Sequence, residues 1–341
     1  MSLVLGIESS CDETAAAVVE DGLRTLSSVV LSQEEIHAPF SGVVPEMACR
    51  AHVESILPVV LRSLEEAGIG MKDLGGIAVA NRPGLVGALL VGVSVAKALA
   101  FARDLPLVGV DHIEAHLHAV RMEHPDFVDA AMVGLVVSGG HTSLYLSRGP
   151  VHFERLGSTV DDAAGEAFDK VAKMTGLAYP GGPVIDRLAR AGNRKAYDFP
   201  RALLDEGSLD FSFSGLKTAV LYACKGRNAR PSTGDLLPDV DLEDVAASFQ
   251  EAVVDVLLQK IQRAVESTGV SKVGVGGGVA CNSRLRERLH QFGTEHGIRV
   301  ACPRPALCSD NAAMIAGLGG YRLEDGVRDD LFLEVAPTSR S

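Results

Sequence analysis

Apolar and polar positions along the chain form short strand-like runs and longer helix-like runs. The opening stretch LVLGIESSCDETAAAVVEDG (3–22) has an apolar run, a polar turn, a second apolar run and a closing Asp-Gly turn, which predicts a β-hairpin. The stretch VGLVVSGGHTSLYLSRG (133–149) repeats this pattern around a Ser-Gly-Gly-His turn. We therefore expect two related lobes, each beginning with a hairpin whose turn faces a common cleft.

Between the hairpins, apolar residues recur at helical spacing. The segment 43–68 predicts a helix that Pro58 kinks, and 75–84 predicts a buried strand that ends in a Pro-Gly turn. The segment 86–104 predicts a closely packed helix rich in small residues, and 105–122 predicts the next strand and helix. Strands that alternate with helices are typical of an α/β protein.

The second half of the chain continues this alternation. Helices are expected within 159–176 and 242–269, and a strand, a glycine turn and a helix within 271–293. A last, alanine-rich helix is expected within 304–323, directly after three residues of types that cap helix N-termini: Ser309, Asp310 and Asn311. The pattern predicts an α/β protein of two similar lobes.

Composition narrows the class of protein. At 341 residues the chain favours two domains over one, and 47% hydrophobic with 22% charged residues is typical of a globular protein. The N-terminus lacks a basic region followed by an apolar run, and no uninterrupted apolar segment approaches the roughly 20 residues of a membrane span. The six cysteines form no CxxC pair, which favours reduced thiols. We expect a cytoplasmic protein.

The net charge of −12 argues against a protein whose whole surface binds nucleic acid, because phosphate contacts require a basic face. Arginine and lysine nevertheless cluster in 203–231 and again in 282–289. A local basic strip, extended by a partner protein, is compatible with this composition.

The stretch DHIEAHLHAV (111–120) is the first candidate for chemistry. On a helix, His112 and His116 lie one turn apart on the same face, the spacing that two imidazoles need to reach one cation. A solvated histidine-rich helix is the alternative, because two ligands do not make a site. Asp310 is the candidate third ligand, with capping of the following helix as its alternative role. His118 points away from His116 and is interpreted as a surface or packing residue.

A zinc protease helix would place a glutamate base directly after the first histidine, as in H-E-x-x-H. Here Ile113 occupies that position and Glu114 follows it. The pattern therefore argues against peptide hydrolysis by that mechanism.

Three further segments carry polar groups that suit a ligand. The glycine turns in VVSGGHT (136–142) and VGVGGGVACN (273–282) offer backbone N–H groups for a phosphate or a carbonyl oxygen, or else they serve packing. The turn SSCDET (9–14) contains carboxylates that can act as a general base or form an ordinary Asx turn. An acid-rich amphipathic helix in DDAAGEAFDK (161–170), followed by a proline-glycine loop in YPGGPVID (179–186), suits recognition of ribose hydroxyls, although solvated helices look similar.

These segments together resemble one family over about residues 3–330. The motifs appear in the family's order: LGIESSCDET, SGVVPEMACRAHV, PGLVGALLVG, DHIEAHL, LVVSGGHT, DDAAGEAFDK, YPGGP, DFSFSGLKT, GGGVACN and CSDNAAMIA. The chain is similar to the TsaD family of bacterial tRNA N6-adenosine threonylcarbamoyltransferases, also called the Gcp or O-sialoglycoprotein endopeptidase family.

The resemblance implies a two-lobed actin-like and Hsp70-like (ASKHA, ribonuclease H-like) α/β fold with duplicated lobes around a central cleft. We assign the lobes to 1–128 with 312–341, and to 129–311. The implied reaction transfers threonylcarbamoyl from L-threonylcarbamoyladenylate to N6 of the adenosine 3′ of the anticodon in tRNAs that read ANN codons, and it releases AMP.

The resemblance also implies roles for individual residues. His112, His116 and Asp310 would bind a divalent metal ion, usually assigned as Fe²⁺ in the family, with Zn²⁺ also found. The adenylate site would be lined by Val136, Val137, Ser138, Gly139 and Gly140, and the nucleoside part by Asp169, Gly182, Asp186 and Asn282.

The chemistry of an activated carbamoyl adenylate requires no protein nucleophile, because positioning the amine and stabilising the leaving AMP are the main tasks. Glu13, ahead of Asp12, is our candidate for accepting a proton from the adenosine amine.

The resemblance implies as partners a TsaB-type non-catalytic paralogue and a TsaE-type ATPase, with a TsaC-type enzyme supplying the adenylate. Binding of tRNA by such an assembly would reconcile the acidic composition with an RNA substrate. One departure is Arg82 in NRPGL, where the family usually has Gly. The competing hypotheses are a metalloendopeptidase, a non-catalytic scaffold paralogue and a sugar-kinase-like ATPase.

Overall fold

The computed structural model describes residues 2–40, 42–204, 207–227 and 235–339. The chain forms two compact units: the first comprises Met1–Ala130, Arg148–Phe153 and Ala306–Ser341, and the second Ala131–Ser147 and Glu154–Pro305. Part of the basic segment 203–231 therefore lies outside the described residues. Asp310 belongs to the first unit. The lobe boundaries given above stay a prediction.

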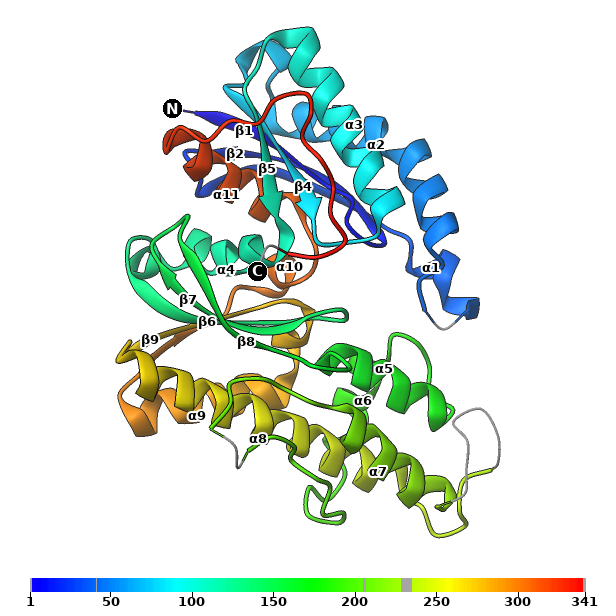
Figure 1. The fold of residues 1–341 in the computed structure, drawn as a ribbon. Coiled ribbons are helices and arrows are strands. Elements are labelled where there is room, and N and C mark those ends of the chain that lie inside the picture. Colours follow the sequence, from blue (N-terminus) through cyan, green and yellow to red (C-terminus); the bar gives the residue numbers. More distant parts are fainter. Residues whose placement is uncertain (1, 41, 205–206, 228–234, 340–341) are drawn as a thin grey trace. The chain divides into compact units, whose positions relative to one another are not determined.

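The first unit is built on a five-stranded mixed sheet in the order β3-β2-β1-β4-β5 (Figure 1). β1 pairs antiparallel with β2 and parallel with β4, β2 pairs antiparallel with β3, and β4 pairs parallel with β5. The parallel strands β1, β4 and β5 therefore end at the same edge of the sheet. The strands are β1 (Leu3–Glu8), β2 (Glu13–Glu20), β3 (Arg24–Ser32), β4 (Gly76–Arg82) and β5 (Leu107–Asp111).

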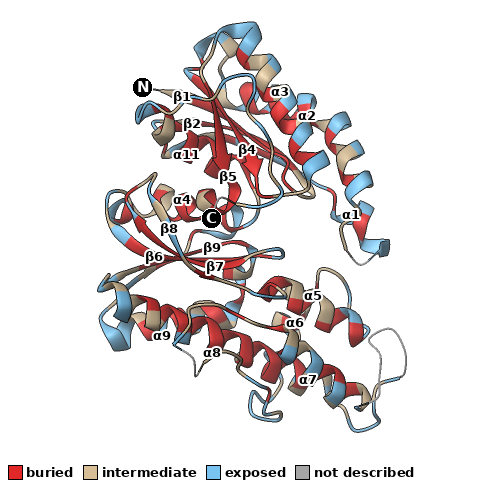
Figure 2. Ribbon diagram, in the orientation of Figure 1, coloured by how far each residue is buried: buried red, intermediate tan, exposed pale blue. Residues whose placement is uncertain are grey.

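Helices cover both faces of this sheet, and alternate strand residues serve the two faces. Leu5 and Ile7 pack in one apolar cluster with α2 (Pro45–Ala67) and α3 (Val86–Arg103). Val4 packs in a second cluster, with α11 (Ala312–Glu324), on the opposite face. Because both faces are covered, β4 is buried throughout and β1 is buried beyond its first residue (Figure 2).

Gly6 explains how closely α11 approaches β1. A Cβ atom at this position would lie 2.3 Å from the carbonyl oxygen of Ala312 and 2.8 Å from the Cβ of Ala316. The helix can therefore rest directly on the strand backbone only because residue 6 has no side chain.

The second unit repeats the sheet of the first. Its order is β10-β9-β6-β7-β8, so β8-β7-β6-β9-β10 corresponds strand for strand to β3-β2-β1-β4-β5. β9 is parallel to both β6 and β10. This common order confirms the duplication that the repeated hairpin predicts. The strands are β6 (Ala131–Val137), β7 (Thr142–Arg148), β8 (Phe153–Ser158), β9 (Lys272–Gly276) and β10 (Arg299–Ala301).

The helices described in the second unit pack against one another (Figure 1). Phe168 of α5 contacts Phe249 of α8 edge to face with ring centroids 5.0 Å apart, which joins two of these helices in the apolar core. The helices are α5 (Ala164–Met174), α6 (Gly181–Leu188), α7 (Ser214–Lys225), α8 (Leu242–Thr268) and α9 (Ser283–His296).

The remaining elements are one helix that packs against α11 and several short helices and turns. They are α1 (Glu34–His37), α4 (His112–Glu123) and α10 (Pro305–Cys308), with 3₁₀ turns at Ala38–Phe40, Met71–Asp73, Pro125–Phe127 and Gly278–Cys281. Most segments that we predict as helices or strands are found as such.

Two local predictions need adjustment. The helix expected within 159–176 begins only at Ala164, because Thr159 and Asp162 before it form a side-chain-stabilised turn. The Pro-Gly loop at 179–186 is instead largely helical, as α6, in which Pro183 lies in the first turn where its missing N–H costs no hydrogen bond. α2 continues as one helix through Pro58.

One helix, α3 (Val86–Arg103), is long and apolar enough to cross a membrane by length and composition alone. A core helix of a soluble protein meets the same criterion, and α3 packs against β4 and α2 of its own unit. Its apolar character is therefore weak evidence for a membrane span.

Candidate metal centre

Helix α4 begins directly at the end of β5, and Asp111 makes the junction. Its Oδ1 accepts hydrogen bonds from the backbone N–H groups of Ile113 at 2.9 Å and Glu114 at 3.4 Å, which caps the helix N-terminus. His112 and His116 follow one turn apart, and both are buried. The cap and the helical spacing together direct the two imidazoles to one side of α4.

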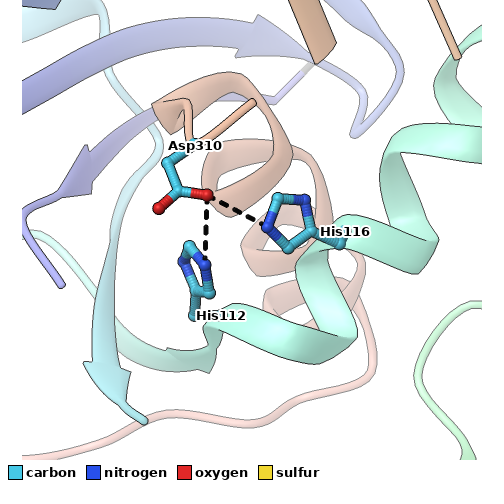
Figure 3. A group of neighbouring side chains, drawn as sticks. All are labelled: His112, His116 and Asp310. Atoms are coloured by element: carbon cyan, nitrogen blue, oxygen red, sulfur yellow. Dashed lines mark hydrogen bonds and ion pairs between the residues drawn. The ribbon is translucent and has the colours of Figure 1, made fainter. Parts of the chain in front are cut away.

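Asp310 reaches the same point from the other end of the chain (Figure 3). The next residue, Asn311, caps α11 by accepting a hydrogen bond from Met314 N–H at 3.0 Å, so the Asp310 carboxylate is not needed as the cap. Its Oδ1 lies 3.2 Å from Nε2 of His116 and 3.4 Å from Nε2 of His112. The three candidate ligand atoms lie within 4.8 Å of one another.

Glu8, the last residue of β1, is a component of the site that our sequence analysis missed. Its Oε2 accepts a hydrogen bond from His112 Nδ1 at 2.8 Å, and its Oε1 accepts one from Ser10 N–H at 2.5 Å. Glu8 is fully buried. A carboxylate that ends an otherwise apolar strand beside a polar turn was the available sequence signal.

The hydrogen bond to Glu8 sets the state of His112. A neutral His112 that donates through Nδ1 presents the lone pair of Nε2 toward the Asp310 carboxylate, an arrangement that requires a cation between them. Burial opposes a charge on His112, yet the carboxylates of Asp310 and Glu8 outweigh it and raise its pKa well above the usual value. Either a proton on His112 or a metal ion beside it would therefore offset the negative charge of Asp310 and Glu8.

The donor set fits a divalent transition metal. Two imidazoles and one carboxylate are the ligand types that Zn²⁺ and Fe²⁺ bind, and the His112–Glu8 pair is the usual outer support of a metal-bound histidine. Burial lowers the pKa of His116, which favours the neutral, ligating form. The described residues therefore include a His-His-Asp group that could hold a metal ion.

The turn between β1 and β2 carries Cys11 and Asp12 in the same unit, and Glu13 is the first residue of β2. Burial raises the pKa of Glu13 to about 10, with the negative charges of Asp310 and Asp12 adding to the effect. Burial, followed by Asp12 and Asp310, also raises the pKa of the Cys11 thiol well above its usual value. A cation bound at Asp310 would offset one contribution to the high pKa of Glu13, so metal binding and ionisation of Glu13 are linked.

The glycine hairpin of the second unit presents backbone rather than side chains. Val136 and Val137 are fully buried in β6, whereas Gly139 and Gly140 are exposed at the turn. Ser138 closes the turn: its N–H donates to His141 O at 2.8 Å, and its Oγ accepts from His141 N–H at 3.2 Å.

The N-terminus of α5 lies directly against this hairpin. Gly165 N–H donates to Ser138 O at 3.1 Å, and a Cβ on Gly165 would come within 2.8 Å of Gly139. A helix N-terminus beside exposed glycine backbone is a suitable place for an anionic group.

The four residues predicted for the nucleoside lie on α5, on α6 and at the start of α9 in the same unit. Asp169 accepts a hydrogen bond from Gly181 N–H at 2.7 Å, which joins α5 to the start of α6, where Gly182 lies. Asp186 accepts from the hydroxyl of Ser283 at 2.8 Å. These contacts link α6 to the start of α9.

Asn282 caps α9 by accepting a hydrogen bond from Leu285 N–H at 3.0 Å, and its amide donates to Gln250 at 2.7 Å. The structure therefore places Asn282 beside Ser283 and Asp186, whereas a nucleoside-binding role for these residues stays a prediction.

Glu114 and His118 lie outside the triad. Glu114 forms an ion pair with Arg322 at 3.7 Å. His118 is fully buried, donates through Nε2 to Gly22 O at 2.8 Å and packs against Tyr321. Burial lowers its pKa to about 4. His118 is thus a packing residue.

Arg82, which stands where the resemblance predicts glycine, ends β4 and pairs in register with Asp111, the residue that caps α4.

Comparison with known proteins identifies the family. The family model described as "TsaD: tRNA N6-adenosine threonylcarbamoyltransferase" matches residues 24–317. A tRNA N6-adenosine threonylcarbamoyltransferase of Geobacter sp. (strain M21) is 54% identical over 336 residues, which cover 98% of this chain and 95% of the relative. The enzyme of the same name from Trichlorobacter lovleyi is 52% identical over 98% of this chain and 96% of its own length.

Solved structures agree in fold at low identity. Full-length HypF superposes with a TM-score of 0.63 at 16% identity, covering 95% of this chain and 47% of HypF. Component A of the Acidaminococcus fermentans (R)-2-hydroxyglutaryl-CoA dehydratase gives 0.55 at 13% identity, covering 95% of this chain and all of that protein. These likenesses support the two-lobed actin-like α/β fold class. The sequence matches, together with this fold, show that the chain belongs to the TsaD family of tRNA N6-adenosine threonylcarbamoyltransferases.

Proposed function

We propose that this chain transfers the threonylcarbamoyl group of L-threonylcarbamoyladenylate to N6 of the adenosine 3′ of the anticodon in tRNAs that read ANN codons. The observation that carries the proposal is the convergence of His112, His116 and Asp310, supported by Glu8, in a chain that belongs to this family. A non-catalytic scaffold has no chemical need for such a set of ligands.

The reaction is an acyl transfer between an amine and a mixed anhydride. The N6 nitrogen forms a bond to the carbamoyl carbon, and the bond from that carbon to the phosphate oxygen breaks. The electron pair leaves with AMP, and the N6 proton must pass to a base. Because the donor is already activated, orientation and charge stabilisation supply most of the rate.

His112, His116 and Asp310 would hold the metal ion, which we propose is Fe²⁺, with Zn²⁺ as the alternative. When bound, the ion supplies a Lewis acid and a template for the phosphate or carbamoyl oxygens. Glu8 keeps His112 in the tautomer that leaves Nε2 available.

Glu13 is the proposed proton acceptor, with Asp12 as the second choice. A carboxyl group can accept the N6 proton only when ionised, and burial with neighbouring negative charge holds Glu13 protonated. Positive charge at Asp310 favours its ionised form. Glu13 would therefore act as a base only in the metal-loaded protein.

The second unit would bind the adenylate. The backbone of Val136, Val137, Ser138, Gly139 and Gly140, with the N-terminus of α5, suits the phosphate. Asp169, Gly182, Asp186 and Asn282 would recognise the nucleoside. Two of these side chains already hold neighbouring helix starts, so they are pre-oriented for hydroxyl groups.

We further propose that a TsaB-type paralogue binds the outward face of α2. Val53, Leu57 and Leu61 recur every fourth residue on this helix and are 62%, 52% and 65% exposed. A stripe of large apolar side chains at helical spacing fits a partner helix. A TsaE-type ATPase completes the proposed assembly. Because this chain has a net charge of −12, we propose that the partners contribute to tRNA binding in the cytoplasm.

The metalloendopeptidase hypothesis has no support in the site, because Glu114, the glutamate nearest the position of a zinc-protease base, pairs with Arg322. The decisive test is reconstitution. Metal-loaded protein with threonylcarbamoyladenylate, both partners and unmodified tRNA is expected to form the modified nucleoside and AMP in equal amounts, measured by mass spectrometry and nucleotide chromatography. Folded, metal-loaded protein that forms neither product would overturn the proposed function.

A further inference from the structure

The turn that carries Asp12 and Glu13 is held by a buried histidine from α2. His52 is fully buried, and its Nε2 lies 3.0 Å from the carbonyl oxygen of Cys11. A carbonyl oxygen can only accept, so Nε2 carries the hydrogen and donates. In the neutral ring Nδ1 must then accept, and the hydroxyl of Thr14 lies 2.7 Å from it. His52 thus contacts the residues on both sides of Asp12 and Glu13.

The charge state of His52 suits this arrangement. Burial lowers its pKa, so the ring is neutral at physiological pH and keeps one donor and one acceptor. Both contacts are therefore maintained under the conditions in which the enzyme would work.

A second buried residue holds the next carbonyl of the turn. Gln33 N–H donates to Asp12 O at 3.0 Å, and the Gln33 amide nitrogen lies 3.4 Å from the ring nitrogens of His52. His37 Nε2 lies 3.2 Å from Gln33 Oε1. The other side of the turn is fixed by Leu85 N–H, which donates to Ser10 O at 2.8 Å. Three consecutive carbonyls of the turn are thus each hydrogen-bonded to a different segment.

These contacts do more than satisfy buried groups. A short turn has few local restraints, and the direction of its carboxylates follows the orientation of its peptide groups. A donor that fixes the Cys11 carbonyl therefore also fixes the peptide plane before Asp12, and with it the backbone from which the Asp12 and Glu13 side chains extend.

We propose that His52 is a positioning residue for the reaction: through its hydrogen bond to the Cys11 carbonyl it holds the Asp12–Glu13 turn in the orientation required for proton transfer. The kinetic part of this proposal rests on the proposed function of Glu13. The structural part, the restraint of the turn, does not depend on it.

The test compares two amides at position 52. The amide nitrogen of a glutamine occupies about the place of Nε2, so His52→Gln keeps a donor for Cys11 O. The shorter His52→Asn keeps a partner for Thr14 but withdraws the donor from the turn. Ser55→Ala is the matched control, because the Ser55 hydroxyl also lies near Thr14, at 3.1 Å, but donates its hydrogen to Ala51 O within the same helix.

Two measurements are made on each full-length, metal-loaded variant. Amide hydrogen exchange, followed by mass spectrometry, reports the peptide that covers residues 9–14, and steady-state assays of the reconstituted complex report kcat and KM. For His52→Asn we expect faster exchange confined to that peptide and a roughly tenfold fall in kcat with little change in KM, because small misplacements of reacting groups cost rate rather than binding. His52→Gln and Ser55→Ala should resemble the wild type, and all variants should retain the metal.

The outcomes separate this proposal from the proposed function. If wild-type protein shows no transfer, the exchange measurement still decides whether His52 restrains the turn. Unchanged exchange and kcat in His52→Asn overturn the proposal. Exchange that accelerates across β1, β2 and α2 together, or an Asn variant that does not fold, also overturns it, because His52 would then support the fold rather than the turn. A kcat loss in His52→Gln equal to that in His52→Asn contradicts the role of the Nε2 donor.

Discussion

The two units share one sheet order, but the turns at the ends of their first hairpins carry different chemistry. In the first unit β1 ends in the buried carboxylate of Glu8, and the turn contains Asp12 and leads into Glu13, the first residue of β2. In the second unit β6 ends in the apolar Val137, and the turn continues with the exposed Gly139 and Gly140. One scaffold thus offers buried ionisable side chains in one unit and accessible backbone N–H groups in the other.

This difference separates two tasks. Buried carboxylates and imidazoles suit a metal ion and a proton, because a low-dielectric setting strengthens their interaction with positive charge. Exposed glycine backbone beside a helix N-terminus suits an anion, because the donors carry no net charge that water must solvate. Variants of the first unit should therefore affect metal and proton chemistry, and variants of the second should affect binding of the nucleotide.

The largest expected effect is the loss of a metal ligand. His116→Ala removes one of three protein ligands, so we expect bound metal and transfer both to fall to background. Metal analysis by mass spectrometry and the transfer assay check this. His118→Gln is the control on the same helix, because it keeps a donor for Gly22 O and should retain both properties. Unchanged metal content in His116→Ala would show that the triad is not the metal site, and full transfer by a metal-free variant would show that the reaction does not need the metal.

A smaller effect is expected when the support of His112 is weakened. Glu8→Gln keeps an acceptor for His112 Nδ1–H but removes the negative charge, and we expect metal affinity to fall about 10–100-fold, as for other outer-shell carboxylates. Competition with a chelator of known affinity measures this. Glu114→Gln is the matched control on α4, and an affinity loss as large as that of Glu8→Gln would contradict the assigned role of Glu8.

In the second unit, Asp186→Ala should act on the nucleotide and not on the metal. The variant loses the acceptor for Ser283 and a proposed contact to the nucleoside, so we expect roughly tenfold weaker binding of the adenylate, the equivalent of about one lost hydrogen bond. Isothermal titration with a non-reactive adenylate analogue checks this. Arg190→Gln, which alters only the exposed partner of Asp186, is the control. A lower metal content in Asp186→Ala would contradict the assignment of metal binding to the first unit and nucleotide binding to the second.

The smallest effect on the isolated chain is expected at α2. Leu57→Glu replaces an exposed side chain, so we expect the free energy of unfolding to change by less than about 0.5 kcal/mol and metal content to stay constant. The complex with the TsaB-type paralogue should nevertheless be lost in size-exclusion chromatography with light scattering. Glu54→Gln, at a polar position of the same helix, is the control. An intact complex in Leu57→Glu would exclude this face as the docking site.

The hydrophobic periodicity of the sequence predicted most helices and strands, because an element's periodicity depends on residues that are close together in the chain. Helical spacing placed α3 and α8 nearly to the residue, and the one-turn spacing of His112 and His116 followed from the same periodicity. α6 was missed because Gly and Pro usually indicate a loop, although Pro is tolerated in the first turn of a helix. The repeated hairpin correctly predicted duplicated units.

The sequence by itself determined the alternation of strands and helices, the pair of histidines and, through its ordered motifs, the family. Only the tertiary structure decided which distant residues meet those histidines. Glu8 is 104 residues from His112, and Asp310 is 194 residues from His116. The parallel strands β1, β4 and β5 end at one edge of the sheet, so Glu8 and His112 become neighbours, and α11 packs on the same sheet with Asp310 just before its first turn. Strand order and helix packing set these contacts, and no local propensity encodes them.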